Sequence, residues 1–248
     1  MQARSARRKQ QSQPQQLQLQ LQFRPGWGGR RPGAGRRPND GVAGVSHRER
    51  AALAPRFPVH VTVKLQQGLP PLRRRAEHAA LRAAFAAGCT GGTSRARGGA
   101  FRLCHYAILN DHLHLLVEGR DRQALCRGIQ GLLVRIAKTL NKLWRRRGKV
   151  FADRYHDRIL ATPRETRNAL RYVLQNARKH AAEGREIAVP QAIDLFTSAP
   201  WFDGFRESFT VRGLEVVVRP VTAARTWMLT IGWRRHGLLS VHELPATG

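Results

Sequence analysis

Two histidines separated by a single residue are the side chains whose types and spacing best suit chemistry. His112 and His114 flank Leu113 in the apolar segment H-L-H-L-L-V. In a β-strand, residues two apart point to the same face, so the two imidazoles would lie together while Leu113 points into the core. Neutral imidazole is a common nitrogen ligand, and the pair could hold one divalent metal ion. The alternative is that both are ordinary polar residues on a solvated strand face.

The net charge indicates a polyanionic partner. The 248 residues contain 44 Lys and Arg against 16 Asp and Glu, which gives a formal net charge of +28. A soluble surface needs far less charge than this, so nucleic acid is the expected partner. An anionic membrane is the competing partner. We do not expect it, because the sequence has neither a run of about 18 apolar residues nor a basic amphipathic helix with a bulky aromatic face.

The cysteine spacing and the composition of the N-terminal residues predict the cellular compartment of the protein and a disordered N-terminal arm. Cys89, Cys104 and Cys126 have no paired spacing, which argues against a zinc knuckle or a disulfide framework. The start of the sequence does not have the pattern of a signal peptide, so we expect a cytoplasmic, nucleoid-associated protein. Residues 1–50 are rich in Gln, Arg and Gly, which predicts a disordered arm with non-specific affinity for phosphate.

Hydrophobic periodicity predicts a folded domain over residues 56–182. The expected elements are strands at 57–65, 101–109 and 113–118, helices at 72–87, 122–147 and 163–181, and a short extended passage at 149–160. The first five of these elements match, in order, the first five of a split βαβ, ferredoxin-like α+β fold. We expect an antiparallel sheet with helices packed on one face and the H-x-H strand near its centre.

Residues 183–248 are predicted to be a C-terminal extension. It contains a candidate strand at 214–218 and a candidate short helix at 226–235 that ends before Gly237. Trp227, Trp233, Arg234 and Arg235 cluster in this helix. They could stack on bases and contact phosphates, or form a small satellite core.

The last predicted helix of the domain carries a second pair of candidate residues. Thr162, Pro163 and Glu165 form a capping box with proline at the first helical position. Tyr172 and Asn176 are four residues apart and therefore share one helix face. They lie at the edge of the apolar stripe, where a side chain could contact both the sheet and a substrate.

The chain resembles the HUH single-tyrosine transposases, and most closely the REP-associated tyrosine transposases, over about residues 58–179. The segments that carry the resemblance are A-I-L-N-D-H-L-H-L-L-V and L-R-Y-V-L-Q-N-A-R-K-H. The family typically has Pro-Asn before H-x-H and Asn-Pro after the Tyr-x-x-x segment. Here Asn110-Asp111 and Asn176-Ala177 stand at those places.

The resemblance implies a metal-assisted transposase that cleaves and rejoins single-stranded or hairpin DNA through a 5′-phosphotyrosine intermediate. It makes His112, His114 and Asn176 ligands of Mg²⁺ or Mn²⁺, with Asn176 also helping to orient the site, and Tyr172 the nucleophile. A phenol, with a pKa of about 10, needs such an ion or a base to react at neutral pH. A homodimer is left open. The side chains predicted to contact DNA are Arg145, Arg146, Arg147, Arg154, Arg158, Arg171, Arg178 and Lys179.

Several alternatives remain open for individual side chains. Tyr155, in the charged segment F-A-D-R-Y-H-D-R, is the alternative nucleophile. It could instead be an edge-strand aromatic residue that packs on the long helix. His60 and His105 could approach the metal ion if their strands adjoin, or they could be ordinary strand histidines.

Three other functions compete with the transposase. The first is a catalytically inactive, domesticated protein that only binds single-stranded nucleic acid. The second is a metal-dependent hydrolase, which we disfavour because a two-histidine phosphoesterase would need a second H-x-H or H-x-T motif. The third is a structural zinc site built from His105, His112 and His114, which would need a cysteine or a fourth ligand.

Overall fold

The computed structural model describes residues 50–90, 99–182, 193–211 and 218–243. The chain divides into two units, Met1–Val42 and Ala43–Gly248, and all described residues belong to the second. The predicted disordered arm, except Arg50, lies outside the described residues, as does the candidate strand at 214–218, except Val218. No helix in the described part of the chain is long and apolar enough to cross a membrane.

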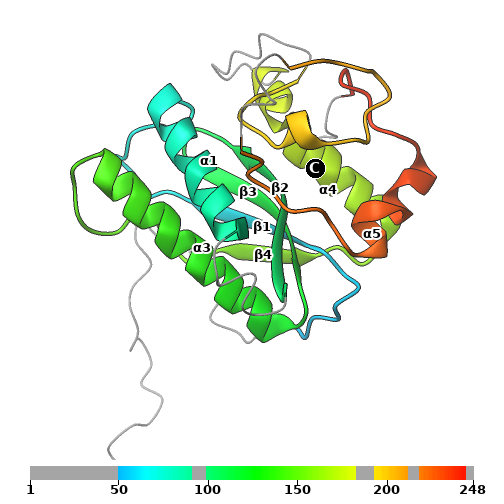
Figure 1. Cartoon of the computed structure of the whole chain (residues 1–248), viewed down its shortest axis with the longest axis horizontal. Coiled ribbons are helices and arrows are strands. Elements are labelled where there is room, and N and C mark those ends of the chain that lie inside the picture. The colour runs from blue at the N-terminus through cyan, green and yellow to red at the C-terminus, as the bar shows by residue number, and fades with distance from the viewer. Residues whose placement is uncertain (1–49, 91–98, 183–192, 212–217, 244–248) are drawn as a thin grey trace, which may run out of the picture. The chain divides into compact units, whose positions relative to one another are not determined.

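The domain has the order β-α-β-β-α-β, followed by one more long helix (Figure 1). The strands pair antiparallel in the order β2-β3-β1-β4, which is the ferredoxin-like α+β arrangement that the sequence predicts. Strand β3, which carries the H-x-H, is central. The elements are β1 (Val59–Lys64), α1 (Arg75–Thr90), β2 (Phe101–Ile108), β3 (His112–Gly119), α3 (Arg122–Leu143), β4 (His156–Ile159) and α4 (Pro163–Ala182). The C-terminal part adds the short helices η2 (Ala199–Trp201), α5 (Trp227–Thr230) and η4 (Gly232–His236).

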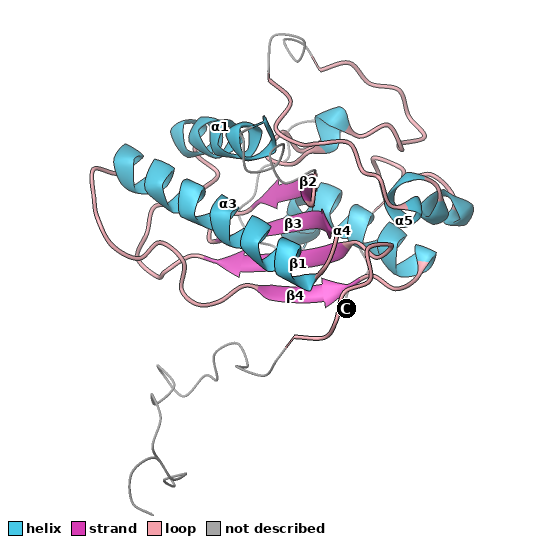
Figure 2. Cartoon of the chain, turned by 60° about the horizontal axis from the view of Figure 1, so that its bottom comes forward, coloured by secondary structure: helices cyan, strands magenta, loops and turns pink. Residues whose placement is uncertain are grey.

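Helices cover both faces of the sheet, so the expectation of helices on one face is wrong. Val61 of β1 and Leu113 of β3 belong to the core formed with α1 and α3. Leu116 of β3 belongs instead to a second core with Leu170 and Val173 of α4. Figure 2 shows α4 on the side of the sheet away from α1 and α3. The physical reason is that the sheet is apolar on both faces, and the stripe of α4 buries the face left open by the first two helices.

Two helix boundaries differ from the predicted ones. Helix α1 continues past Gly88 to Thr90. A Cβ atom on Gly88 would lie 3.1 Å from the Leu132 side chain, so this glycine permits close packing of α1 on α3 rather than ending the helix. Helix α3 ends at Leu143 instead of residue 147, because Arg145 already adopts a left-handed backbone with φ of 49°.

The C-terminal part packs on the outer edge of β2. Ser198 N–H donates to Tyr106 O at 3.0 Å, and Thr222 N–H donates to Leu103 O at 2.9 Å. Trp233 is fully buried in the core that α4 forms on the sheet, while Trp227 is exposed. The extension is therefore tied into the domain over its described length.

Candidate active site

Pairing of β1 with β3 gathers three histidine rings on the sheet face that α4 covers. Thr62 stands opposite His114, and Lys64 stands opposite His112. His60 precedes Thr62 by two residues, so its ring projects to the same face. The ring centroids of His112 and His114 are 4.8 Å apart, and those of His60 and His114 are 5.2 Å apart. The structure thus adds His60 to the predicted pair.

The first histidine of the pair is oriented by the residue before it. His112 Nδ1 lies 2.7 Å from Asp111 Oδ1. An ionised carboxylate only accepts hydrogen bonds, so the imidazole nitrogen is the donor. Burial opposes the charge of Asp111, but the hydrogen bond and the attraction of His112 hold its pKa below the ordinary value. In the neutral ring, a donating Nδ1 leaves a lone pair on Nε2 of His112, which is the form that metal coordination requires.

The second histidine is buried and contacts two side chains of β1. His114 is 4% exposed. Its Nδ1 lies 3.1 Å from Thr62 Oγ1 and 3.2 Å from His60 Nε2. Burial, and then the charge of Arg158, lower the pKa of His60 to about 4. His60 is therefore a neutral ring at pH 7 and brings no positive charge into the site.

Helix α4 brings the predicted nucleophile onto the three rings. The Tyr172 centroid lies 5.0 Å from that of His114 and 5.8 Å from that of His60, both edge-on. The helix begins as predicted. Glu165 N–H donates to Thr162 Oγ1 at 3.1 Å, and Thr162 N–H donates to the Glu165 carboxylate at 3.2 Å. Tyr172 is half-buried, which matches its predicted place between core and solvent.

Asn176, one turn after Tyr172, is fully buried. No described residue lies within hydrogen-bonding distance of its Oδ1 or its Nδ2. The helix is kinked between the two residues at Gln175, whose φ and ψ are −124° and 15°. Leaving a buried polar group without a partner costs about 1–3 kcal/mol, and each such group calls for an explanation in catalysis or in binding.

The side chains fit a divalent metal ion held by few protein ligands. Within the described ranges, no three His, Cys, Asp or Glu residues form a metal-binding group. His112 and His114 would supply imidazole nitrogens, and the Asn176 amide oxygen, which is buried and has no described hydrogen-bonding partner, would supply an oxygen. Mg²⁺ and Mn²⁺ retain water or phosphate oxygens, so a site with few protein ligands suits them.

The alternative nucleophile, Tyr155, lies in the other core, with α3. Its hydroxyl donates to Cys126 Sγ at 3.2 Å, and the Arg50 guanidinium lies 3.8 Å from its ring centre. Burial, and then the hydrogen bond with Cys126, raise the pKa of Tyr155. The structure therefore separates Tyr155 from the histidine rings by the sheet and leaves it a weaker nucleophile than an ordinary tyrosine.

His105 is not brought to the other histidines. Its Nδ1 lies 3.2 Å from Ser198 Oγ, and its ring packs edge-on against Phe202 at 5.4 Å. Burial, and then the charge of Arg219, lower its pKa to about 4. His105 is thus a strand histidine that anchors the C-terminal part.

No family model matches the chain, and no curated protein matches it. Among solved structures, the chain is similar to a REP-associated tyrosine transposase bound to a REP hairpin. The identity is 17% and the TM-score is 0.42, and the similar region covers 54% of this chain and 74% of that one. This is a distant similarity, so membership in that family stays a prediction.

A second histidine motif is present on β1, contrary to the expectation that disfavoured the hydrolase. Residues 60–62 read H-V-T, which is the H-x-T pattern, and both polar side chains contact His114. The alternation of Val59, Val61 and Val63 is the signal that places His60 and Thr62 on one face. That β1 adjoins β3 could not be read from this alternation.

The side chains predicted to contact DNA differ in their surroundings. Arg158 pairs with Glu165 and Arg171 pairs with Glu243, each at 2.8 Å. Burial opposes the charge of Glu243, but hydrogen bonds from Arg167 and Arg171 lower its pKa to about 2. The others are Arg145, Arg146 and Arg147 at the end of α3, the exposed Arg154, and Arg178 and Lys179, whose side chains lie outside the described part.

Proposed function

We propose that the chain is a single-stranded DNA transposase that cleaves and rejoins strands through a 5′-phosphotyrosine link at Tyr172. The observation that supports it most is the packing of the Tyr172 ring against His114 and His60, with the buried Asn176 one turn further along α4. The net charge of +28 supports DNA as the partner.

In the cleavage step, the phenol oxygen of Tyr172 attacks the scissile phosphorus, and the bond from phosphorus to the 3′ oxygen breaks. The phenol proton leaves during attack, and the departing oxygen takes up a proton to become a 3′-OH. The His60 ring lies edge-on to Tyr172 with 5.8 Å between centroids, but its lowered pKa makes it a weak base, so the phenol proton passes to solvent. A divalent ion on His112, His114 and Asn176 would neutralise charge on the phosphate. Attack of a 3′-OH on the phosphotyrosine reverses the step, so rejoining needs no ATP.

Covalent trapping tests this proposal. The protein is incubated with single-stranded hairpin oligonucleotides from DNA flanking its gene, labelled at the 5′ or the 3′ end, with Mg²⁺ or Mn²⁺. We expect a metal-dependent adduct on a denaturing gel that carries the 3′ label, because the 5′ phosphate of the downstream fragment is the attached group. The adduct should be lost in Tyr172→Phe and His112→Ala and kept in Tyr155→Phe. An adduct that survives Tyr172→Phe would refute the assigned nucleophile.

The H-V-T motif beside the H-x-H supports a second candidate function, hydrolysis of a phosphodiester without a covalent intermediate. Here a histidine would activate water, and Tyr172 would have no chemical part. The same gel distinguishes the two functions. Hydrolysis predicts free, cleaved fragments in both wild type and Tyr172→Phe, with loss of cleavage in His60→Ala. Tight binding with neither adduct nor cleavage, over several flanking sequences, would indicate a binding protein.

A further inference from the structure

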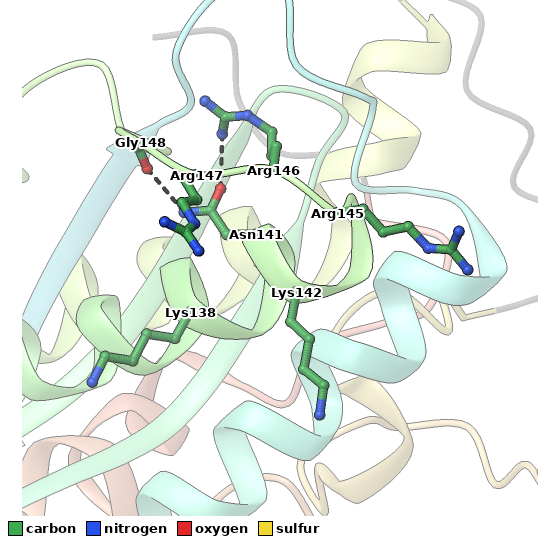
Figure 3. A pocket seen from close by; sticks show the side chains of 7 residues that line it. All are labelled: Lys138, Asn141, Lys142, Arg145, Arg146, Arg147 and Gly148. Atoms are coloured by element: carbon green, nitrogen blue, oxygen red, sulfur yellow. Dashed lines mark hydrogen bonds between the residues drawn. The ribbon is translucent and has the colours of Figure 1, made fainter.

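A basic hollow of about 450 Å³ lies at the C-terminal end of α3. We call it the α3 hollow. Figure 3 shows its cationic side chains arranged around the last turn of the helix and the loop that follows. The cations that line it are Lys138, Lys142, Arg145, Arg146 and Arg147.

The charges of the α3 hollow are not balanced by carboxylates of the described chain. Lys138, Lys142, Arg145 and Arg147 are exposed, and no described Asp or Glu lies within 4.0 Å of their nitrogens. Arg122, at the other end of α3, does pair with a carboxylate, that of Asp157. Cations crowded around one hollow repel each other unless an anion binds between them.

The loop that carries the arginines is held in place before any ligand binds. Asn141 on α3 accepts from Arg146 Nη1 and donates to Gly148 O, both at 2.9 Å. The backbone N–H of Arg146 also donates to Asn141 O at 2.9 Å. Arg145 has a positive φ of 49°, a conformation that costs a non-glycine residue about 1 kcal/mol. The hydrogen bonds fix the geometry of the loop, which lowers the entropy cost of binding a ligand there.

The α3 hollow lies within reach of the candidate active site. After Gly148 the chain runs to Ala152, whose N–H donates to Lys64 O. Lys64 in turn stands opposite His112 on β3. Two strand spacings of about 4.8 Å and four residues of at most about 3.5 Å each put the loop within about 24 Å of His112. That distance corresponds to about seven base pairs of duplex at 3.4 Å per base pair.

We infer that the α3 hollow binds the phosphodiester backbone of the DNA that occupies the candidate active site, as a second contact outside that site. This inference rests on the proposed function for the identity of the polymer, but not on the cleavage chemistry. Arginine and lysine around a hollow with no carboxylate lining it recognise phosphate without reading sequence. The contact therefore strengthens binding equally for all sequences of the same form.

The test is the salt dependence of DNA binding by the full chain, measured by fluorescence anisotropy in EDTA so that no cleavage occurs. The variant is Lys142→Gln/Arg145→Gln, and the matched control is Arg127→Gln/Arg164→Gln. The control removes two exposed arginines, one from the other end of α3 and one from the first turn of α4. Lys138→Gln/Lys142→Gln is a second variant that leaves the strained loop unchanged, and circular dichroism checks that each variant folds.

Two lost phosphate contacts lower the slope of log K against log salt by about 1.8 for duplex DNA and about 1.4 for a single strand. Between 50 and 200 mM salt, the wild type should therefore lose about 12-fold more affinity than the variant for a duplex, and about 7-fold more for a single strand. The form of DNA in the hollow is the one whose slope falls by the full amount calculated for it, while the slope for the other probe stays at the wild-type value.

Equal slopes for wild type, variant and control on both probes would overturn the inference. So would an equal decrease in the variant and in the control, because the effect would then be general charge. A failure of the proposed function would give a different result. The wild type would then form no covalent adduct with DNA, while the variant and the control would still differ in the slope of log K against log salt.

Discussion

Replacing Asn176 with leucine should stabilise the protein and abolish its chemistry. The Asn176 amide is fully buried, and neither of its polar atoms has a hydrogen-bonding partner among the described residues. Leucine has the same branching at Cγ and no polar atoms to desolvate. Side chains that are needed for catalysis or binding commonly lower the free energy of unfolding of the protein.

The magnitude follows from the two unpaired atoms. A buried polar group without a partner costs about 1–3 kcal/mol, and the bulkier methyl groups of leucine remove part of the gain. We expect the free energy of unfolding of Asn176→Leu to rise by about 1–2 kcal/mol. For a folded unit of about 200 residues this corresponds to an increase in Tm of about 2–8 °C. Asn176→Ala, which cannot overpack, serves as the second variant.

The assays are thermal and urea unfolding followed by circular dichroism, together with Mn²⁺ binding followed by electron paramagnetic resonance. We expect higher stability and weaker Mn²⁺ binding in the same variant. Gln175→Leu is the matched control on the neighbouring residue, because its amide donates to Ser240 O and its loss should destabilise. If Asn176→Leu lowers the Tm as much as Gln175→Leu does, Asn176 has structural hydrogen bonds and the reasoning is refuted.

Three further predictions concern the surrounding structure. The pKa of Glu243 is lowered from 4.5 to about 2, so its charge stabilises the fold above pH 4.5 and that contribution disappears as the pH falls to 2. In urea titrations Glu243→Gln should therefore be less stable than wild type at pH 6, and most of this difference should be lost by pH 2. Glu118→Gln removes the buried negative charge that pairs with Arg102 and one of the two oxygens that accept hydrogen bonds there, and we expect a loss of about 3 kcal/mol in the same titration. Tyr155→Phe should lose about 1 kcal/mol with its hydrogen bond to Cys126 and form the covalent adduct at the wild-type rate; a slower rate would implicate Tyr155 in the chemistry.

Local patterns in the sequence were enough to predict the parts of the site that local physics determines. The period of two on β3 predicts the shared face of His112 and His114, and the structure has both rings on that face. The capping box predicts the start of α4, and hence the turn on which Tyr172 stands. These features depend on neighbours within a few residues, which a sequence displays directly.

Features of the site that depend on contacts between residues far apart in the sequence could not be predicted from local patterns. His60 joins the site because β1 pairs with β3, more than fifty positions further along the chain. Tyr155 and Tyr172 lie on opposite faces because α4 packs on the face away from α3. Both tyrosines have polar or charged neighbours in the sequence, so only the tertiary arrangement separates the buried one from the one beside the histidines.

The C-terminal part gives the clearest case of such distant control, because it holds the helix that carries the candidate nucleophile. Arg167 on α4 donates to Gly237 O at 2.9 Å and to the Glu243 carboxylate at 2.8 and 2.9 Å. One turn later, Arg171 donates to the same carboxylate. After a further turn, Gln175 donates to Ser240 O, at the kink that separates Tyr172 from Asn176. Residues 237–243 therefore hold α4 in position over the histidine rings. The C-terminal extension thus positions Tyr172, just as the sheet positions the histidines.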